Sequence, residues 1–224
     1  MVPPDKRPAQ ELMKGHFARA ADAREDLIKG DIEAARASMK WLAEHKHAGN
    51  LDAELQPLLT AMQASAAEFA KATTLREAGV SLALTLNRCG DCHLKAEAGP
   101  EIAIPPLPDG ETAKAHMRRH LWAAQRMWEG LVTRNAETFS SGTEVLAESP
   151  LHPEALVPGD QKETVAKLVT HLHELGEKAK AAKQPAEQAE VYGNFLATCA
   201  ACHRLLGRGP GAAAEAPGGT APTE

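Results

Sequence analysis

The four cysteines of this 224-residue chain all belong to one kind of short motif. The first motif is Cys89-Gly-Asp-Cys92-His93, and the second motif is Cys199-Ala-Ala-Cys202-His203. Cys-x-x-Cys-His is the attachment signature of c-type haem. Two thiols three residues apart on a helix can form thioethers with the two vinyl groups of one porphyrin, and the adjoining histidine can then supply an axial nitrogen to the iron. We therefore expect two covalently attached haem c groups, with His93 and His203 as the proximal iron ligands.

Two other uses of paired cysteines remain open at this point. A redox-active dithiol of the thioredoxin type needs a βαβ setting, and no strand pattern is visible in the sequence. A zinc ion could take cysteine and histidine from each motif, but two complete Cys-x-x-Cys-His strings are more than such a site needs. The spacing therefore favours haem over both alternatives.

The composition favours helices and excludes several classes of protein. Only 8 residues are aromatic, whereas a β-sandwich or barrel needs more aromatic and β-branched residues. The formal net charge of −5 lacks the basic excess of a typical nucleic-acid binder, so no nucleic-acid partner is expected. No stretch approaches 18 consecutive apolar residues, which predicts no transmembrane segment in this chain.

Weak but ordered internal similarity indicates a tandem duplication. The segment Lys14-Gly15-His16-Phe17 matches Lys114-Ala115-His116-Met117 at an offset of 100 residues. Leu42-Ala43-Glu44 then matches Leu146-Ala147-Glu148 at an offset of 104, and the two haem motifs are 110 residues apart. The extra four residues, 131–134, equal about one helical turn, so they can lengthen a helix without rotating its apolar face.

Each half is predicted to form four helices, from apolar positions three and four residues apart. In the first half the helices cover 11–29, 32–42, 58–69 and 75–93; Gly30 ends the first, Asp31 caps the second, and Thr73 or Thr74 caps the fourth. In the second half they cover 112–134, 135–148, 161–183 and 186–206, with a loop that contains Pro150, Pro153 and Pro158. The predicted organisation is an N-terminal extension (1–8), a first haem-binding bundle (9–97), a Pro-rich linker (98–109), a second haem-binding bundle (110–208) and a disordered Gly/Ala/Pro tail (209–224).

The position of the motif at the end of each fourth helix resembles the class II cytochromes, the cytochrome c′ family. In that family a four-helix bundle holds the haem between its first and last helices. The resemblance implies an all-α fold of two tandem four-helix bundles, each with one covalent haem c near the C-terminal end of its fourth helix. It also implies that Cys89, Cys92, Cys199 and Cys202 are the thioether sites.

The distal side departs from that family, whose members usually place an apolar side chain over the iron. His16 and His116 stand at equivalent positions in the first helix of each half. In an up-down-up-down bundle the start of the first helix lies beside the end of the fourth, so we expect these histidines to be distal iron ligands. The alternative is that both lie at the edge of the apolar stripe and hydrogen-bond to solvent or to a haem propionate. His120, one turn after His116, is the reserve ligand, and Met13 and Met117 are weaker reserves.

The function predicted from these residues is electron transfer between redox partners by a di-haem c-type cytochrome with bis-histidine iron. A cytochrome c′-like protein that binds or senses NO or CO at an open distal site is the alternative. A di-haem peroxidase is a third possibility, but no nucleophile–base or acid–base pair accompanies either motif, so we expect no enzymatic activity.

Covalent haem implies export, because attachment takes place on the exported side of a bacterial membrane. The N-terminus, Met1-Val-Pro-Pro-Asp-Lys-Arg-Pro, has no apolar region of a signal peptide. We expect a periplasmic or otherwise exported protein whose signal peptide or anchor was removed from this sequence. Its expected partners are redox proteins or a larger membrane-bound electron-transfer complex, through which it could associate with the membrane.

Overall fold

The computed structural model describes residues 7–45, 51–100, 102–103, 105–148 and 161–207, which form helices joined by turns and loops, with no strand among them. The all-α class is thus confirmed for this part of the chain. The helices are α1 (Arg7–Lys29), α2 (Ile32–Glu44), α3 (Gln56–Glu68) with the short 3-10 turn η1 (Phe69–Lys71), α4 (Leu75–Lys95), α5 (Ala113–Thr133), α6 (Ala136–Glu148), α7 (Lys162–Ala181) and α8 (Pro185–Leu205). None of these helices is long and apolar enough to cross a lipid bilayer.

Three parts of the predicted organisation lie outside the described residues. They are most of the N-terminal extension, the loop with Pro150, Pro153 and Pro158, and the C-terminal tail. Arg7 and Pro8 of the predicted extension belong to α1.

Local sequence signals set the helix ends, as predicted. The Asp31 side chain caps α2 by accepting a hydrogen bond from the backbone N–H of Ala34, at 2.9 Å. Thr74 caps α4 in a capping box with Glu77, whose carboxylate accepts from the Thr74 backbone N–H. Each such cap typically stabilises a helix by about 1 kcal/mol.

The four extra residues of the second repeat lengthen its first helix. From the matched lysines, Lys14 and Lys114, α5 continues four residues further than α1 before it ends. Gly30 after α1 has φ +84° and Arg134 after α5 has φ +56°, so both helices end in the left-handed conformation that closes a helix C-terminus. Gly30 and Arg134 are 104 residues apart, which is the offset that follows the inserted turn.

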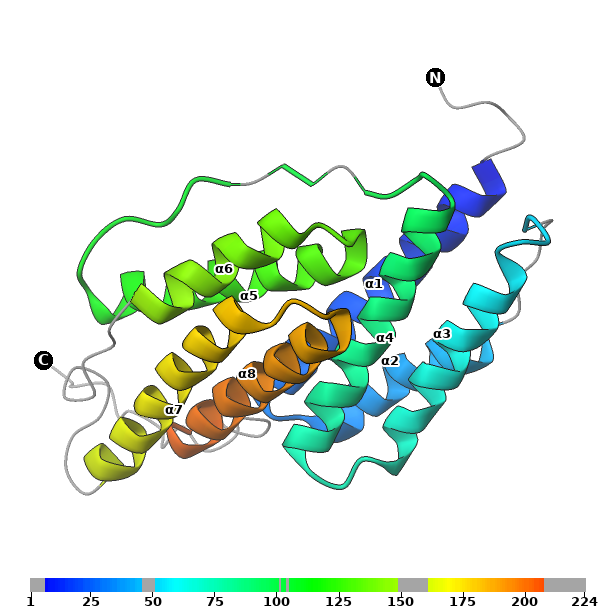
Figure 1. Ribbon diagram of the computed structural model, residues 1–224. Helices are drawn as coiled ribbons and strands as arrows, with labels where there is room; N and C mark the ends of the chain where they lie inside the picture. Colours follow the sequence, from blue (N-terminus) through cyan, green and yellow to red (C-terminus); the bar gives the residue numbers. More distant parts are fainter. Residues whose placement is uncertain (1–6, 46–50, 101, 104, 149–160, 208–224) are drawn as a thin grey trace, which may run out of the picture.

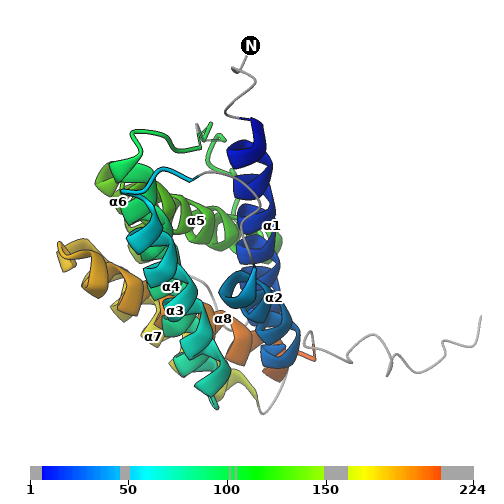
Figure 2. The same ribbon diagram turned by 90° about the vertical axis from the view of Figure 1, so that its right-hand side faces the viewer.

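Successive helices pack side by side within each half, α1 to α4 and α5 to α8. Figure 1 shows α6 and α7 on one side of the molecule and α3 on the other, and Figure 2 shows α1 and α2 on the side opposite α6 and α7. The linker passes along α5 from the end of α4 to the start of α5 (Figure 1). It is held there by hydrogen bonds from the Trp122 indole to the Pro105 carbonyl, at 3.0 Å, and from Arg119 to the Gly110 carbonyl, at 2.6 Å.

The halves meet most closely where α4 packs against α8. A Cβ atom on Gly79 would lie 2.3 Å from the carbonyl oxygen of Gly193, and one on Gly193 would lie 2.5 Å from the Cα of Val80. Ala83 and Ala189 are both 0% exposed. Small residues spaced by four therefore let the two backbones come into direct contact, an approach that larger side chains would prevent.

The contacts along this pair show that α4 and α8 are antiparallel. Gly79 lies against Gly193, and eight residues later on α4 the Asn87 amide donates a 2.6 Å hydrogen bond to the carbonyl of Pro185, eight residues earlier on α8. Cys89 lies ten residues after Gly79, and Cys199 lies six residues after Gly193. Because the two helices are antiparallel, the motifs lie in opposite directions from the glycine contact. At 1.5 Å per residue, the two motifs are separated by roughly 24 Å along the helix axes.

One hydrophobic core runs through both halves. Its fully buried members include Leu27 and Met39 from the first half and Trp128, Phe139 and Phe195 from the second. Each half by itself was predicted to form a bundle around its own haem. In the structure the described helices of both halves share this core.

A buried polar network joins α1 to α5 at mid-helix. The Arg24 guanidinium donates to the Gln125 side chain at 2.6 Å and lies over the Trp128 ring, 4.8 Å from its centroid. Gln125 donates to Glu129 at 2.7 Å, and Glu129 forms an ion pair with Arg126 in which both side chains are at most 2% exposed. Burial raises the pKa of the Glu129 carboxyl, and the hydrogen bond from Gln125 and the neighbouring guanidinium groups oppose that rise. The network links the first helices of the two halves.

Candidate haem sites

The first motif forms the last turns of α4 and packs against the end of α5. A Cβ on Gly90, inside the motif, would lie 2.3 Å from the carbonyl oxygen of Leu131. Asp91 forms an ion pair with Arg134, the residue that closes α5, and the Arg134 guanidinium also donates to the Asn87 side chain at 3.3 Å. The two variable residues of this motif, Gly90 and Asp91, thus fix the end of α5 against it.

This packing positions the His93 imidazole. Its Nδ1 lies 2.9 Å from the carbonyl oxygen of Val132 in α5. A carbonyl can only accept a hydrogen bond, so Nδ1 holds the proton and Nε2 keeps its lone pair. Burial lowers the pKa of His93, with the hydrogen bond to Val132 opposing that shift, and a lowered pKa keeps the ring neutral. A neutral imidazole whose Nδ1–H is bound to a carbonyl is the form in which histidine binds a metal through Nε2.

The second motif repeats this arrangement with α1 in place of α5. His203 Nδ1 lies 2.8 Å from the carbonyl oxygen of Ile28. Ile28 and Val132 are 104 residues apart, the offset of the repeat after the inserted turn. Arg204, which follows His203, lies over Gly30 at the end of α1, and a Cβ on Gly30 would come within 2.8 Å of its Nε. The cation therefore sits at the C-terminus of α1, where the helix dipole favours positive charge.

None of the four motif cysteines forms a disulfide, and each residue is partly buried. Burial raises the pKa of Cys89 to about 12, with the neighbouring Cys92 as a smaller cause. Burial likewise raises the pKa of Cys199 to about 12. Because the thiolate is the reactive form of cysteine, these thiols are unreactive in the folded, haem-free chain at neutral pH.

This protection can be measured by alkylation. At pH 8, raising a thiol pKa from 9.0 to about 12 lowers its thiolate fraction by roughly a thousandfold. We expect Cys89 and Cys199 of the folded, haem-free protein to react with iodoacetamide more than about a hundredfold more slowly than in urea, as followed by peptide mass spectrometry. Equal rates in the folded and unfolded protein would contradict this.

The donor set of each motif fits a haem c. Two cysteines outside any disulfide lie three residues apart on one helix, and the adjoining imidazole has its Nδ1 on a backbone carbonyl, which leaves the lone pair on Nε2. Among the residues that the structure describes, no three His, Cys, Asp or Glu side chains come together as a metal-binding group. The zinc site considered above would need such a group, drawn from motifs that lie at opposite ends of the α4–α8 pair.

The predicted distal residue His16 lies at the same end of the molecule as the first motif. It is 8% exposed. Its neighbour Phe17 packs edge-on against Trp128, with ring centroids 4.6 Å apart, and Trp128 is one turn before Val132, the partner of His93. The structure therefore brings the start of α1 to the region of the first motif.

His16 belongs to an aromatic cluster that the sequence did not predict. Its ring lies edge-on to Trp41 and to His45, with centroids 5.9 and 6.0 Å away. Trp41 and His45 are themselves stacked at 4.0 Å at the end of α2. His45 was interpreted as a helix-end residue, but its place beside His16 makes it a second candidate ligand. Its spacing of four residues from Trp41 was the only sequence signal for this cluster.

At the second motif, His116 and His120 both lie buried at the start of α5, 9% and 4% exposed. Met117, which lies between them in sequence, packs against Val165 and Val169 of α7, and so do Leu205 and Leu206 at the end of α8. The start of α5 is therefore at the same end as His203. Of the reserve methionines, Met117 takes part in this apolar packing, and Met13 is half-buried in α1.

Arg119 interacts with the His116 ring. Its guanidinium lies 3.0 Å from His116 Nδ1 and 3.4 Å from Nε2. A guanidinium can only donate, so the nearer ring nitrogen, Nδ1, accepts. Binding iron through Nε2 requires a proton on Nδ1, and therefore requires Arg119 to move away. This contact favours His120 over His116 as a distal ligand at the second site.

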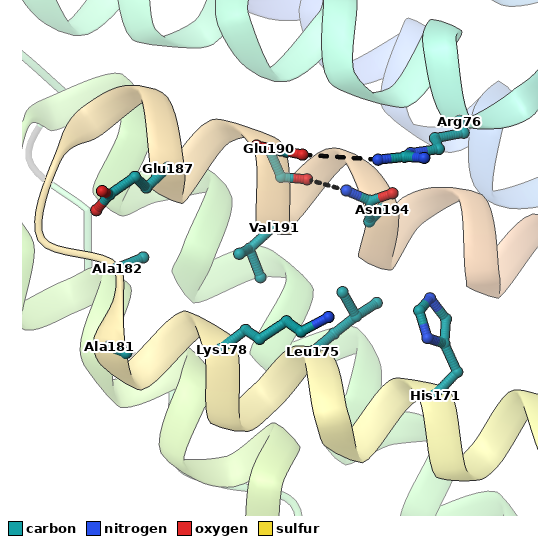
Figure 3. A pocket seen from close by; sticks show the side chains of 10 residues that line it. All are labelled: Arg76, His171, Leu175, Lys178, Ala181, Ala182, Glu187, Glu190, Val191 and Asn194. Atoms are coloured by element: carbon teal, nitrogen blue, oxygen red, sulfur yellow. Dashed lines mark hydrogen bonds and ion pairs between the residues drawn. The ribbon is translucent and has the colours of Figure 1, made fainter.

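A surface groove lies elsewhere, between α7, α8 and the start of α4 (Figure 3). Its floor includes Leu175 and Val191, and its rim carries His171 and Lys178. On one side of the groove, Arg76 of α4 and Glu190 of α8 form an ion pair at 3.6 Å. None of the predicted haem-site residues lines the groove.

Comparisons with protein-family models, with curated proteins and with solved structures found no match for this chain.

Proposed function

We propose that the protein is a di-haem c-type cytochrome that transfers single electrons between redox partners. One haem c is held by thioethers to Cys89 and Cys92, and the other by thioethers to Cys199 and Cys202. His93 and His203 bind the irons through Nε2. In this proposal each half of the chain supplies one haem-binding motif, near the C-terminal end of its fourth helix.

One observation supports this proposal most directly. The histidines of both motifs have Nδ1 on a backbone carbonyl, at 2.9 and 2.8 Å, which fixes the tautomer that an axial iron ligand needs. A pair of redox-active dithiols would not require this arrangement of the adjoining histidine. The haem, when bound, supplies the redox chemistry, and the chain contributes burial, ligands and orientation.

The distal ligands decide between electron transfer and gas binding. We propose His16 at the first iron, and His116 or His120 at the second, which makes both irons bis-histidine and six-coordinate. Such irons change their geometry little between Fe(III) and Fe(II) and leave little room for an added ligand. The imidazoles of His16, His116 and His120 are buried, each at the end of the molecule that holds the corresponding motif. This burial supports the bis-histidine assignment over a cytochrome c′-like site that binds NO or CO.

The first test is haem content. Expressed with a signal peptide in a host that attaches haem c, the chain is expected to have the mass of two haems in intact mass spectrometry. The double variant Cys89→Ser/Cys92→Ser should keep only the haem of the second motif. The double variant Cys199→Ser/Cys202→Ser should keep only the haem of the first motif. A chain without covalent haem under these conditions would contradict the proposed function.

The second test is ligation. Absorption spectra of the ferric and ferrous protein should show six-coordinate low-spin haem that carbon monoxide does not change. His16→Ala is expected to give one high-spin haem that binds carbon monoxide. At the other haem, one of His120→Ala and His116→Ala should do the same, and the Arg119 contact makes His120→Ala the expected one. His171→Ala, on the groove in α7, is the control and should change nothing. High-spin spectra of the unmodified protein would instead favour the gas-binding function.

Covalent haem also supports an exported location, since c-type haem is attached outside the cytoplasm. The proposed partners are redox proteins or a membrane-bound electron-transfer complex.

A further inference from the structure

The structure assigns to each proximal histidine a hydrogen-bond acceptor from the opposite half of the chain. We infer that this hydrogen bond would tune the reduction potential of the iron that the histidine binds. Val132 in α5 is the positioning residue for His93 of the first motif, and Ile28 in α1 is the positioning residue for His203 of the second. Neither haem site is then complete within one repeat. This inference rests on the proposed function, because it concerns the potentials of the two haems.

The exchange follows the symmetry of the repeat. His93 and His203 are equivalent residues of the two motifs, and Val132 and Ile28 are equivalent residues near the ends of α5 and α1. A contact within each half would pair His93 with α1 and His203 with α5. Both hydrogen bonds instead cross between the halves, which is the pattern expected when two repeats exchange an element.

The carbonyls are held firmly in place. At the first motif, Gly90 allows the Leu131 carbonyl to approach directly, and Arg134 joins the end of α5 to Asp91. At the second motif, the Arg204 side chain covers Gly30 at the end of α1. These contacts join the end of each helix to the motif of the opposite half.

A hydrogen bond from Nδ1–H to a carbonyl makes the imidazole a more basic ligand. A more basic ligand stabilises Fe(III) relative to Fe(II), so it lowers the reduction potential of that iron. Weakening the hydrogen bond should therefore raise the potential of one haem and leave the other unchanged.

The test uses the full-length, haem-loaded protein and two alanine variants on either side of His93. Gly90→Ala forces the end of α5 away, because the new Cβ would meet the Leu131 carbonyl at 2.3 Å. Gly99→Ala is the control, because its Cβ would make an ordinary contact of 3.7 Å with His93 Cβ. In a spectroscopic redox titration, we expect Gly90→Ala to shift the reduction equilibrium of one haem about tenfold, or ~59 mV, toward Fe(II). Gly99→Ala should shift neither haem.

A variant in the other half tests the exchange itself. Gly30 belongs to the first repeat, yet Gly30→Ala is expected to raise the potential of the haem on the second motif, because it disturbs the end of α1 at His203. The haems are assigned by repeating each titration in the variants with serine at one pair of cysteines. A shift at the haem of the first motif instead would overturn the inference.

A measurement on the unmodified protein covers the case in which a variant does not fold. In the reduced protein, NMR should show slow solvent exchange of the Nδ1 protons of both His93 and His203. Rapid exchange of these protons, or equal potentials in Gly90→Ala and Gly99→Ala, would overturn the inference. The proposed function would still stand in that case if the protein carried two covalent haems. Absence of haem from the mass spectrum would instead contradict the proposed function.

Discussion

Replacing Gly79 by valine is expected to destabilise the protein by more than about 3 kcal/mol. The added Cβ would lie 2.3 Å from the carbonyl oxygen of Gly193, so the backbones of α4 and α8 would have to separate. Neither helix can yield by rotating a side chain, because the atom in the way belongs to the backbone. Separation would also loosen the packing of Leu82 and Leu86, which are fully buried in the shared core. The free energy of unfolding from urea denaturation, followed by circular dichroism, measures this effect.

Gly15→Ala is the matched control for this substitution. Gly15 also lies inside a long helix, but a Cβ there would meet only the edge of the Trp41 ring, at 3.4 Å. Alanine favours the helix over glycine by about 1 kcal/mol, so this variant should be as stable as the unmodified protein or more stable. If Gly79→Val and Gly15→Ala had similar stabilities, the close approach of α4 and α8 would be absent in solution.

Dividing the chain in the linker is expected to abolish folding of both pieces. A fragment of residues 1–104 would expose the face of α4 that packs against α8, and residues 105–224 would expose the matching face of α8. Exposing one fully buried leucine such as Leu82 costs about 1.5–3 kcal/mol, and domains of about 100 residues have little stability to lose. Each separate haem-free fragment should therefore unfold without a cooperative transition, whereas a mixture of the two should recover one.

Thermal unfolding followed by circular dichroism, together with sedimentation velocity, distinguishes the outcomes. The mixture is expected to sediment as a one-to-one complex. A fragment that is monomeric and unfolds cooperatively by itself would show instead that the halves are independent bundles, as the composition and the repeat predicted. The unmodified chain, haem-free under the same conditions, is the reference for both measurements.

Local features were predictable because the interactions that form them are close in sequence. The capping residues Asp31 and Thr74 act within three or four positions of themselves, and the apolar stripes repeat within single helices. The inserted turn at 131–134 lengthened α5, and α6 still follows α5 as α2 follows α1. Eight helices and an all-α class followed from these short-range signals for the described residues.

The contact of α4 with α8 had a weaker signal. Five buried residues of α4 are small or apolar: Ala78, Gly79, Leu82, Ala83 and Leu86. In an alanine-rich chain, however, small residues on a helix do not say which other helix approaches them. That choice depends on how whole faces of both halves fit together.

By itself, the sequence determined the pattern on which the proposed haem chemistry rests: four cysteines with no remainder, each pair followed by a histidine, at the ends of two equivalent helices. The tertiary structure alone decided which part of the chain positions each histidine. The acceptors at Val132 and Ile28 are backbone carbonyls, and since every residue has one, no residue type marks them. Only the packing of α5 on the first motif and of α1 on the second selected these two, and that packing also set the roughly 24 Å between the motifs.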